Sequence, residues 1–238
     1  MSVFHFKRFD VSNERAAMKL GTDSVLLGAL AGIPDRVERV LDVGTGTGVV
    51  ALMLAQRLSF KQTEHSFFID AIDIDGPSIE EASENFLQSP WSRCFRAEHC
   101  ALSQWSGKYD LIVSNPPFFD ASLLNPDSRK SLTRHSISLS YRELCDFASR
   151  CLTDNGVLSM ILPSDVEKHL MRTAISYSLY PRSVTIVRTT EKKPARRIVV
   201  DFGRNRMGVC RNSELIMTSS GMITDQYRSL LDSFLVNL

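Results

Sequence analysis

A short run of alternating glycines constrains the fold of this chain more than any other feature. Gly44, Gly46 and Gly48 follow the apolar run 39–43 and precede the breaker-free stretch 49–58. Glycines at alternate positions let the backbone turn tightly and come close to a ligand. A helix that begins behind them presents unpaired N–H groups. The order strand, glycine turn, helix is typical of a nucleotide-type binding site in an α/β protein.

Apolar runs and helix-forming stretches alternate along most of the 238 residues. This alternation predicts a Rossmann-like α/β fold with a mainly parallel, seven-stranded sheet and helices on both faces. The predicted strands are 39–43, 67–74, 94–97, 109–114, 157–162, 184–189 and 196–202. The last two are joined without a helix, which predicts an antiparallel hairpin at one edge of the sheet. We expect an N-terminal extension over residues 1–35, followed by one domain over residues 36–238.

The helices are expected between these strands and at the end of the chain. A turn is expected at 154–156, and Ser164 and Asp165 predict the cap of the helix that follows them. The predicted helices are 49–58, 78–88, 141–151, 166–177 and 226–235.

Composition narrows the class of protein. The 28 basic and 27 acidic residues leave a net charge of +1, but the acid gathers in 70–85 and the base in 182–211. The longest run without a charged residue, 43–56, is too short to cross a bilayer. The five cysteines show no metal-binding spacing. We therefore expect a cytoplasmic protein, a monomer, with no bound metal and no membrane contact.

The glycine turn itself excludes the commonest phosphate-binding sites. Its Gly-x-Gly-x-Gly spacing departs from the dinucleotide fingerprint and lacks the Gly-Lys-Ser/Thr ending of a P-loop. No Lys or Arg lies between Val40 and Gln56 to meet a pyrophosphate, and Asp42 places an acid against the turn. An acid favours a ligand with a cationic or amine-bearing end. The candidate residues of this turn are Asp42, Gly44, Thr45, Gly46 and Gly48.

A second acidic feature ends the next predicted strand. Asp73 stands where a ribose-binding carboxylate is expected, and Ile74 beside it joins the candidate cofactor residues. Asp75 lies on the same side of the strand end, where a solvated end of strand explains it equally well. An adenosine-like ligand without phosphates and with a positive amino-acid end describes S-adenosylmethionine.

The strand 109–114 ends in Asn115-Pro116-Pro117-Phe118. The two prolines stiffen the turn and leave its carbonyls free to accept hydrogen bonds. The Asn115 side-chain oxygen and the Pro116 carbonyl can each accept one N–H bond from a planar amino group, which holds the nitrogen lone pair toward a methyl donor. Phe118 offers a face on which a flat base can stack, once that base has left its own stack.

These residues resemble the motifs of class I S-adenosylmethionine-dependent methyltransferases, where Asn-Pro-Pro-Phe/Tyr marks the branch that methylates planar amino nitrogens. The runs 4–9, 17–29 and 88–91 resemble the bacterial tRNA1(Val) adenine N6-methyltransferase family. The similarity extends over nearly the full length of the chain and weakens after about Val200. The resemblance implies N6-methylation of the adenine 3′ of the anticodon in a valine tRNA. It also implies that the extension 1–35 covers the site, with Lys19, Thr22 and Asp23 over the methionine end of the cofactor. Thr22 and Asp23 equally predict caps for a helix over 24–31.

Two positions depart from that family's pattern. Phe118 replaces the commoner tyrosine, which keeps the stacking face and loses a hydroxyl. Ala101 stands where an acid usually binds the adenine amine of the cofactor, so Glu98 or a backbone carbonyl takes that role, or the contact is absent.

Basic segments indicate where RNA would lie. The stretch 121–140 and the loop 192–197 both carry cations that can meet phosphates. The candidates are Arg129, Lys130, Arg134, Lys192, Lys193, Arg196 and Arg197.

Three other functions stay open. A glutamine N5-methyltransferase of release factors uses the same chemistry on an amide, although only about 35 residues precede the first core strand here. A DNA adenine methyltransferase would need room for a target-recognition domain. A non-catalytic RNA- or cofactor-binding protein on a methyltransferase scaffold is the third.

Overall fold

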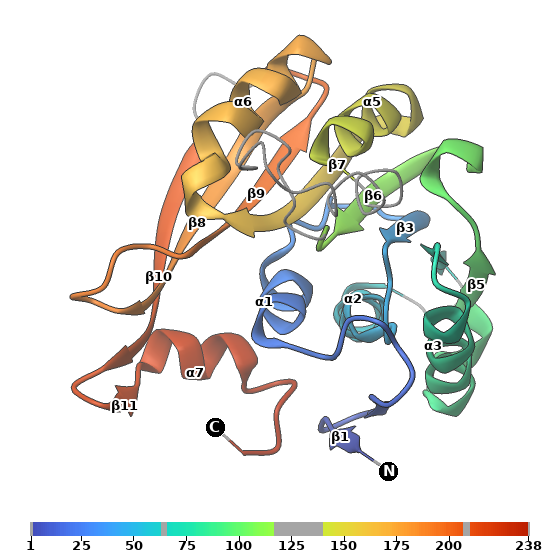
Figure 1. Cartoon of the computed structure of the whole chain (residues 1–238), viewed down its shortest axis with the longest axis horizontal. Coiled ribbons are helices and arrows are strands. Elements are labelled where there is room, and N and C mark those ends of the chain that lie inside the picture. Colours follow the sequence, from blue (N-terminus) through green and yellow to red (C-terminus); the bar gives the residue numbers. More distant parts are fainter. Residues whose placement is uncertain (1, 63–65, 117–139, 207–209, 238) are drawn as a thin grey trace, which may run out of the picture.

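A computed structural model describes residues 2–62, 66–116, 140–206 and 210–237 (Figure 1). Within these residues a nine-stranded sheet forms the centre, in the order β11-β10-β8-β9-β7-β6-β3-β4-β5. Neighbouring strands from β5 to β7 are parallel, whereas β9 runs antiparallel to both β7 and β8. A separate hairpin, β1 (Val3–His5) with β2 (Asp10–Ser12), opens the chain.

The strands of the large sheet have the following bounds: β3 Arg39–Val43, β4 Phe68–Asp73, β5 Phe95–His99, β6 Tyr109–Ser114, β7 Leu152–Pro163, β8 Tyr180–Thr190, β9 Arg197–Gly203, β10 Arg211–Ser219 and β11 Met222–Ile223. The α-helices are α1 Thr22–Leu30, α2 Val49–Lys61, α3 Gly76–Gln88, α5 Tyr141–Cys151, α6 Glu167–Ser176 and α7 Asp225–Leu231.

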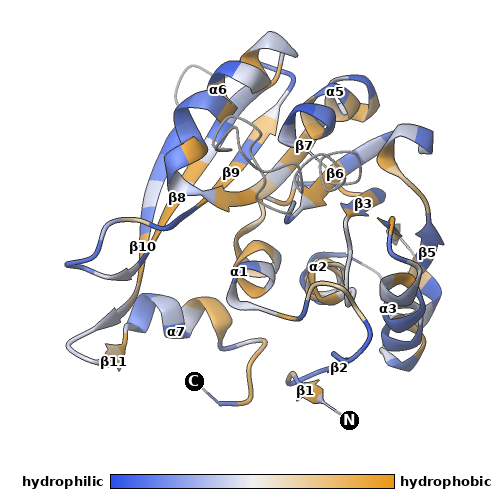
Figure 2. Cartoon of the chain, viewed as in Figure 1, coloured by the Kyte–Doolittle hydropathy of each residue, from blue (hydrophilic) through white to orange (hydrophobic). Residues whose placement is uncertain are grey.

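Helices cover both faces of the sheet because apolar residues on its strands alternate between two cores. Val40 and Leu111 belong to the core with α1, α2 and α7. Leu41 and Ile112 belong to the core with α5 and α6 on the other face. Figure 1 shows these two helical layers on opposite sides of the strands. Figure 2 shows hydrophobic residues along β7 and β9 and hydrophilic residues on much of α6.

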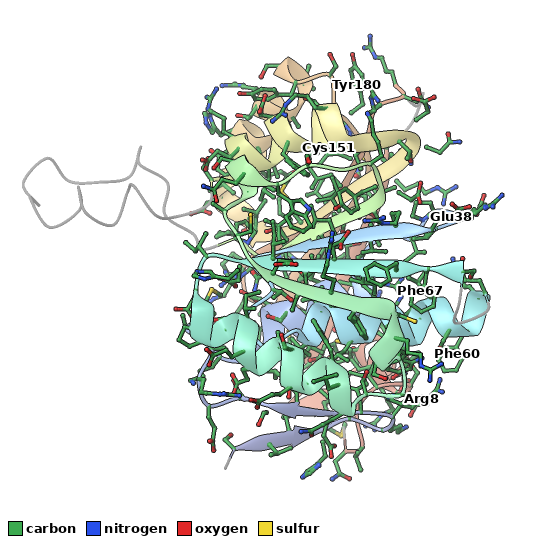
Figure 3. The ribbon with its side chains drawn as sticks, turned by 90° about the vertical axis from the view of Figure 1, so that its right-hand side faces the viewer. Arg8, Glu38, Phe60, Phe67, Cys151 and Tyr180 are labelled. Carbon is green, nitrogen blue, oxygen red and sulfur yellow. The ribbon has the colours of Figure 1, made fainter. Side chains whose placement is uncertain are left out.

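Strand register brings three carboxyl ends together. Val43 pairs with Ile72 on β4 and with Ser114 on β6, and Ser114 Oγ donates to the Val43 carbonyl at 2.8 Å. The strand order reverses between β3 and β6, and ligands of open α/β sheets bind at such a switch point. Glu38, Phe60 and Phe67 mark the opposite end of the sheet layer, where β3 and β4 begin and α2 ends (Figure 3).

The Rossmann-like α/β class expected from the sequence is confirmed, and so is the antiparallel pairing of β8 with β9. The expected edge position of that hairpin is wrong, since β10 and β11 extend the sheet beyond β8 to nine strands. β10 pairs parallel to β8 and carries few apolar residues, so its sequence gives a weak strand signal.

Two local expectations are also wrong. The turn expected at 154–156 lies inside β7, where the register against β6 shifts between Tyr109 and Leu111, so the extra residues form an irregularity of the strand. Ser164 does not cap α6: it begins a 3₁₀ turn that ends at Val166, and its hydroxyl donates to the Ala195 carbonyl at 2.7 Å. Asp165 lies within the same turn and makes no side-chain cap.

In the described part of the chain, no helix has the length and the apolar character needed to cross a membrane.

A buried ion cluster ties the four strands β3 to β6 together at the end opposite the glycine turn. Asp70 on β4 is fully buried. It pairs with Arg39 at 2.5 Å and with Arg96 at 2.7 Å, and it accepts the Tyr109 hydroxyl at 3.0 Å. Burial raises the pKa of Tyr109 to about 12, so this hydroxyl remains a donor at neutral pH.

We expect Asp70→Asn to lower the free energy of unfolding by about 2–3 kcal/mol, because both arginines lose a buried anion yet are half-exposed and regain water. Urea unfolding monitored by circular dichroism measures this loss. Asp146→Asn is the matched control, since Asp146 and Arg150 form an exposed i,i+4 pair worth about 0.5 kcal/mol. Equal losses in the two variants would contradict a stabilising role for the cluster.

Candidate functional site

A hollow that is partly open to solvent lies at the carboxyl ends of β3 and β6. Its wall comes from three parts of the chain: the glycine turn with the first turn of α2, the N-terminal segment, and the end of β6. The lining residues are Met18, Lys19, Ser24, Asp42, Gly44, Thr45, Gly46, Thr47, Val49, Val50 and Asn115. The glycine turn and Asn115, predicted separately from the sequence, therefore share one site.

The glycine turn has the backbone that its sequence predicts. Gly46 has φ of 54° and Gly48 has φ of 80°, in the left-handed region that favours glycine. A Cβ on Gly48 would also lie 2.5 Å from Phe86 Cε1, so α3 packs directly against the turn. Gly48 precedes α2 without a side-chain cap, and Val49 and Val50 in the first turn of the helix line the hollow.

Asp42 is buried beneath the turn and accepts the Thr45 hydroxyl at 2.7 Å. Burial raises the pKa of Asp42 to about 7, and the nearby charge of Asp73 adds to the rise. The hydrogen bond from Thr45 acts in the opposite direction. A cation bound next to Asp42 would stabilise its ionised form and lower this raised pKa.

Asp73 ends β4 beside the turn. Its Oδ2 accepts Gly46 N–H and its Oδ1 accepts Asp75 N–H, each at 2.9 Å. Burial raises the pKa of Asp73, although these backbone N–H bonds oppose the rise. The Ile74 N–H is a third backbone donor to this carboxylate, so of its roughly four acceptor sites about one remains for a hydroxyl of a ligand.

The neighbours of Asp73 have distinct surroundings. Asp75 caps α3 by accepting Ser78 N–H at 2.9 Å, which gives it a structural role. Ile74 is 45% exposed, an unusual exposure for an isoleucine next to a buried turn. Glu98 is exposed on β5, and Ala101 precedes the 3₁₀ turn Leu102–Gln104.

Asn115 follows β6 and lines the hollow. Its Nδ2 donates to Ser24 Oγ at 3.3 Å. Its Oδ1 is buried and has no hydrogen-bond partner within the described residues. Since a buried acceptor without a partner is costly, this oxygen marks a place for a ligand donor. Pro116 is buried beside it, whereas Pro117 and Phe118 lie outside the described residues.

The N-terminal candidates divide between the hollow and its rim. Lys19 lines the hollow. Thr22 is exposed as the first residue of α1, and Gly21 is the N-cap, so the expected side-chain caps from Thr22 and Asp23 are wrong. The helix begins two residues earlier than expected, which places both side chains in its first turn. Asp23 instead pairs with Arg197 at 2.8 Å and joins α1 to β9.

The predicted RNA contacts are only partly described. Lys192, Lys193 and Arg196 are exposed on the loop between β8 and β9. Arg197 starts β9 opposite Pro163, the last residue of β7, so this loop lies at the same end of the sheet as the hollow. Arg129, Lys130 and Arg134 lie outside the described residues.

Five lining residues were not predicted from the sequence: Met18, Ser24, Thr47, Val49 and Val50. Thr47, Val49 and Val50 neighbour the predicted glycines, so their sequence position was a usable signal. Met18 and Ser24 likewise neighbour the predicted Lys19 and Asp23, but it is the packing of the N-terminal segment that brings their side chains to the hollow.

The residues present fit S-adenosylmethionine. Asp42 suits a positively charged amino-acid end, and Asp73 has free acceptor capacity for ribose hydroxyls. Asp73 does not itself line the hollow but contacts its wall through the Gly46 N–H, and the glycine backbone of that wall permits close approach of a ligand. Among the described residues that line the hollow, Lys19 is the one cation, so the site is poorly suited to a polyphosphate.

Comparison with known proteins supports this chemistry. A family model described as the methyltransferase small domain matches residues 16–178. A relative from Flavobacterium psychrophilum is 36% identical, covering 99% of this chain and 100% of its own. One from Aeromonas salmonicida is 37% identical, covering 100% and 98%. Both are named tRNA1(Val) (adenine(37)-N6)-methyltransferase.

Solved structures share the fold at low identity. The "predicted O-methyltransferase" of Agrobacterium tumefaciens has a TM-score of 0.59 at 18% identity, covering 91% of this chain and 100% of its own. The ribosomal protein L11 methylase of Lactobacillus delbrueckii subsp. bulgaricus has a TM-score of 0.50 at 18% identity, covering 77% and 78%.

The raised pKa of Asp42 predicts a pH-dependent ligand affinity. In the free protein this pKa is about 7 instead of 3.8, so the stability that protonated Asp42 contributes is lost as the pH rises through about 7. Binding of a cationic amine favours ionised Asp42, so S-adenosylmethionine should release a proton at pH 6 and bind more tightly toward pH 7.5. Calorimetry in two buffers of different ionisation enthalpy measures the number of protons released on binding. Asp42→Asn should abolish this proton release, and its persistence in that variant would contradict the assignment to Asp42.

Proposed function

The chain belongs to the family of the tRNA1(Val) (adenine(37)-N6)-methyltransferases, and we propose that it transfers a methyl group from S-adenosylmethionine to N6 of adenine 37 in a valine tRNA. The observation that carries the proposal is Asn115 Oδ1, a buried acceptor without a partner in the described residues, at the hollow that Asp42 and the glycine turn share. An exocyclic amino group is the donor that such an oxygen suits.

Asp42, Asp73 and the glycine turn would hold the cofactor. Asp42 would bind the amine of its methionine end, Asp73 would bind its ribose hydroxyls, and the backbone of Gly44, Gly46 and Gly48 would allow close contact. Thr45 holds Asp42 in place through its hydroxyl. Ile74 supplies an apolar contact for the adenine ring. S-adenosylmethionine, when bound, supplies a methyl group on a positively charged sulfur.

Asn115 and Pro116 would hold the target amine. The N6 lone pair of adenine is conjugated with the ring and is a poor nucleophile. Two hydrogen bonds, to Asn115 Oδ1 and to the Pro116 carbonyl, favour the tetrahedral nitrogen of the transition state over the planar ground state. Ser24 Oγ accepts a hydrogen bond from Asn115 Nδ2. This bond would direct the other end of the amide, Oδ1, toward the N6 amine of the target adenine. Pro117 and Phe118 complete the motif in this proposal, Phe118 as the stacking face.

The remaining expectations belong to the same proposal. Residues 1–35 act as an extension that covers the cofactor site, and residues 36–238 form the methyltransferase domain. Lys19, Thr22 and Asp23 lie at the methionine end of the cofactor or on its rim. The protein acts as a monomer in the cytoplasm without a metal.

Substitution of Asn115 tests the chemistry. We expect Asn115→Ala to lower kcat about 10²–10³-fold, the cost of removing one preorganised transition-state hydrogen bond. Ser24→Ala keeps the acceptor Asn115 Oδ1 but removes the bond that orients the Asn115 amide. We therefore expect kcat to fall less in this variant, about tenfold. The substrate is tRNA from cells that lack the gene, and nucleoside mass spectrometry measures N6-methyladenosine. Methylation of a release factor and not of tRNA would favour the glutamine N5-methyltransferase, and cofactor binding without any transfer would favour a binding protein.

Neutralising the loop cations tests the RNA surface. We expect Lys192→Gln with Lys193→Gln to raise KM for tRNA several-fold and to leave kcat unchanged, because cations that meet phosphates contribute to binding and not to chemistry. The slope of log affinity against log salt should fall by about 0.7–0.9 for each phosphate that is no longer neutralised. Arg196→Gln belongs to the same series. Lys61→Gln, at the far end of α2, is the control, and an equal effect there would reject the loop as a specific surface.

A further inference from the structure

Helix α3 carries three buried polar side chains on one face. Ser78, Glu81 and Asn85 are spaced by three and four residues, which puts them on the same side of the helix. Their exposed fractions are 1%, 1% and 2%. Buried polar groups of this kind need hydrogen-bond partners, and the partners identify what this face, the α3 polar face, holds in place.

Glu81 binds three consecutive backbone N–H groups of the N-terminal segment. Its Oε1 accepts Glu14 N–H at 2.6 Å and Arg15 N–H at 3.0 Å, and its Oε2 accepts Ala16 N–H at 2.8 Å. Burial favours the neutral acid, but these hydrogen bonds outweigh it and lower the pKa of Glu81. The carboxylate is therefore charged at neutral pH and binds the segment through charge-assisted hydrogen bonds.

Ser78 and Asn85 extend the contact to both sides of Glu81. Ser78 Oγ accepts Ala17 N–H at 3.1 Å. Asn85 exchanges two bonds with Ser12, accepting its N–H at 2.8 Å and donating to its carbonyl at 3.1 Å. The same Asn85 amide donates to the Thr47 carbonyl at 2.9 Å, so it joins the segment to the glycine turn.

The segment continues directly into the wall of the hollow. We call residues 13–20 the strap. Met18 and Lys19 of the strap line the hollow, and the Met18 carbonyl would lie 3.5 Å from a Cβ on Gly46. Inside the strap, Leu20 N–H donates to Asn13 Oδ1 at 2.9 Å and Lys19 Nζ donates to the Glu14 carbonyl, so these residues hold one another as a unit. Figure 1 shows this N-terminal stretch of chain passing α3 before it reaches α1.

The start of α3 is also joined to the predicted ribose acid. Asp75, two residues after Asp73, accepts both the N–H and the hydroxyl of Ser78, at 2.9 and 2.6 Å. Ser78 thus contacts the end of β4 through Asp75 and the strap through Ala17. One helix face therefore joins the strap, which lines the hollow, to the end of β4, where the proposed ribose acid Asp73 lies.

We propose that the α3 polar face sets the affinity for S-adenosylmethionine by holding the strap closed over the methionine end, with Glu81 as the main positioning residue. The inference rests on the proposed function only in that S-adenosylmethionine occupies the hollow. Glu81 is not among the residues that line the hollow, so it is placed to act through the strap. Glu81 affects binding by setting the fraction of protein molecules whose strap is in place. The apparent affinity for S-adenosylmethionine is the intrinsic affinity multiplied by that fraction.

Glu81→Gln tests the proposal because it keeps the side-chain volume and replaces one acceptor oxygen by an NH2 group that faces backbone N–H donors. We expect the Kd for S-adenosylmethionine to rise about tenfold, as for a strap in place about a tenth of the time. Calorimetry measures this Kd. Hydrogen exchange of the amides of 14–17 should accelerate while that of β3 stays unchanged. At saturating cofactor, kcat on tRNA should remain within about twofold of the wild-type value. General destabilisation does not produce a raised Kd together with an unchanged kcat.

Two further variants complete the test. Glu80→Gln changes an exposed neighbour whose carboxylate lies 3.8 Å from Arg15, and it should leave the Kd within about twofold, as exposed pairs contribute little. Ser78→Ala removes the bonds of its hydroxyl to Ala17 and Asp75 and should raise the Kd about threefold. It decides the question if Glu81→Gln does not fold.

The outcomes separate the two proposals. Wild-type affinity in Glu81→Gln and Ser78→Ala, with faster exchange in the strap, would overturn the positioning role and leave the proposed function intact. A wild-type protein that binds no S-adenosylmethionine would overturn both.

Discussion

The hydrogen bond from Gly46 N–H to Asp73 Oδ2 is the contact on which the geometry of the site depends. It joins the turn after β3 to the end of β4, and the register of β3 with β6 places Asn115 beside that turn. Parallel strands end at the same edge of a sheet, so three short sequence motifs from separate parts of the chain converge there. The left-handed backbone at Gly46 is part of the tight turn that brings this N–H close to the end of β4.

The buried acids at the two ends of the sheet differ in their electrostatic surroundings. At the carboxyl end of the strands, buried Asp42 and half-buried Asp73 lie close together with raised pKa values, because burial disfavours both charges and the charge of Asp73 adds to the rise at Asp42. At the amino end, buried Asp70 is paired with Arg39 and Arg96. One buried acid is thus neutralised by the fold itself, while the other two gain from a cationic and hydroxyl-bearing ligand.

The N-terminal segment contributes to the wall of the hollow as the sheet does. Its strap adds Met18 and Lys19 to the hollow and is held by backbone bonds to the α3 polar face. Backbone N–H groups have the same chemistry in every residue, so the residue types of the strap do not indicate this contact. Ser24 adds a second case, since its bond to Asn115 spans two distant segments.

The sequence by itself determined the local chemistry: the glycine turn, the acid at the end of the next strand, the Asn-Pro-Pro motif and the strand–helix alternation that made the fold class predictable. These features depend on residues that are neighbours in the chain. Only the tertiary structure decided the contacts between distant segments: β10 beside β8, Asp23 against Arg197, and the grip of Glu81 on the strap. Strand pairing and backbone hydrogen bonds of this kind leave little trace in residue type, because they follow from how the packed layers bring the segments together.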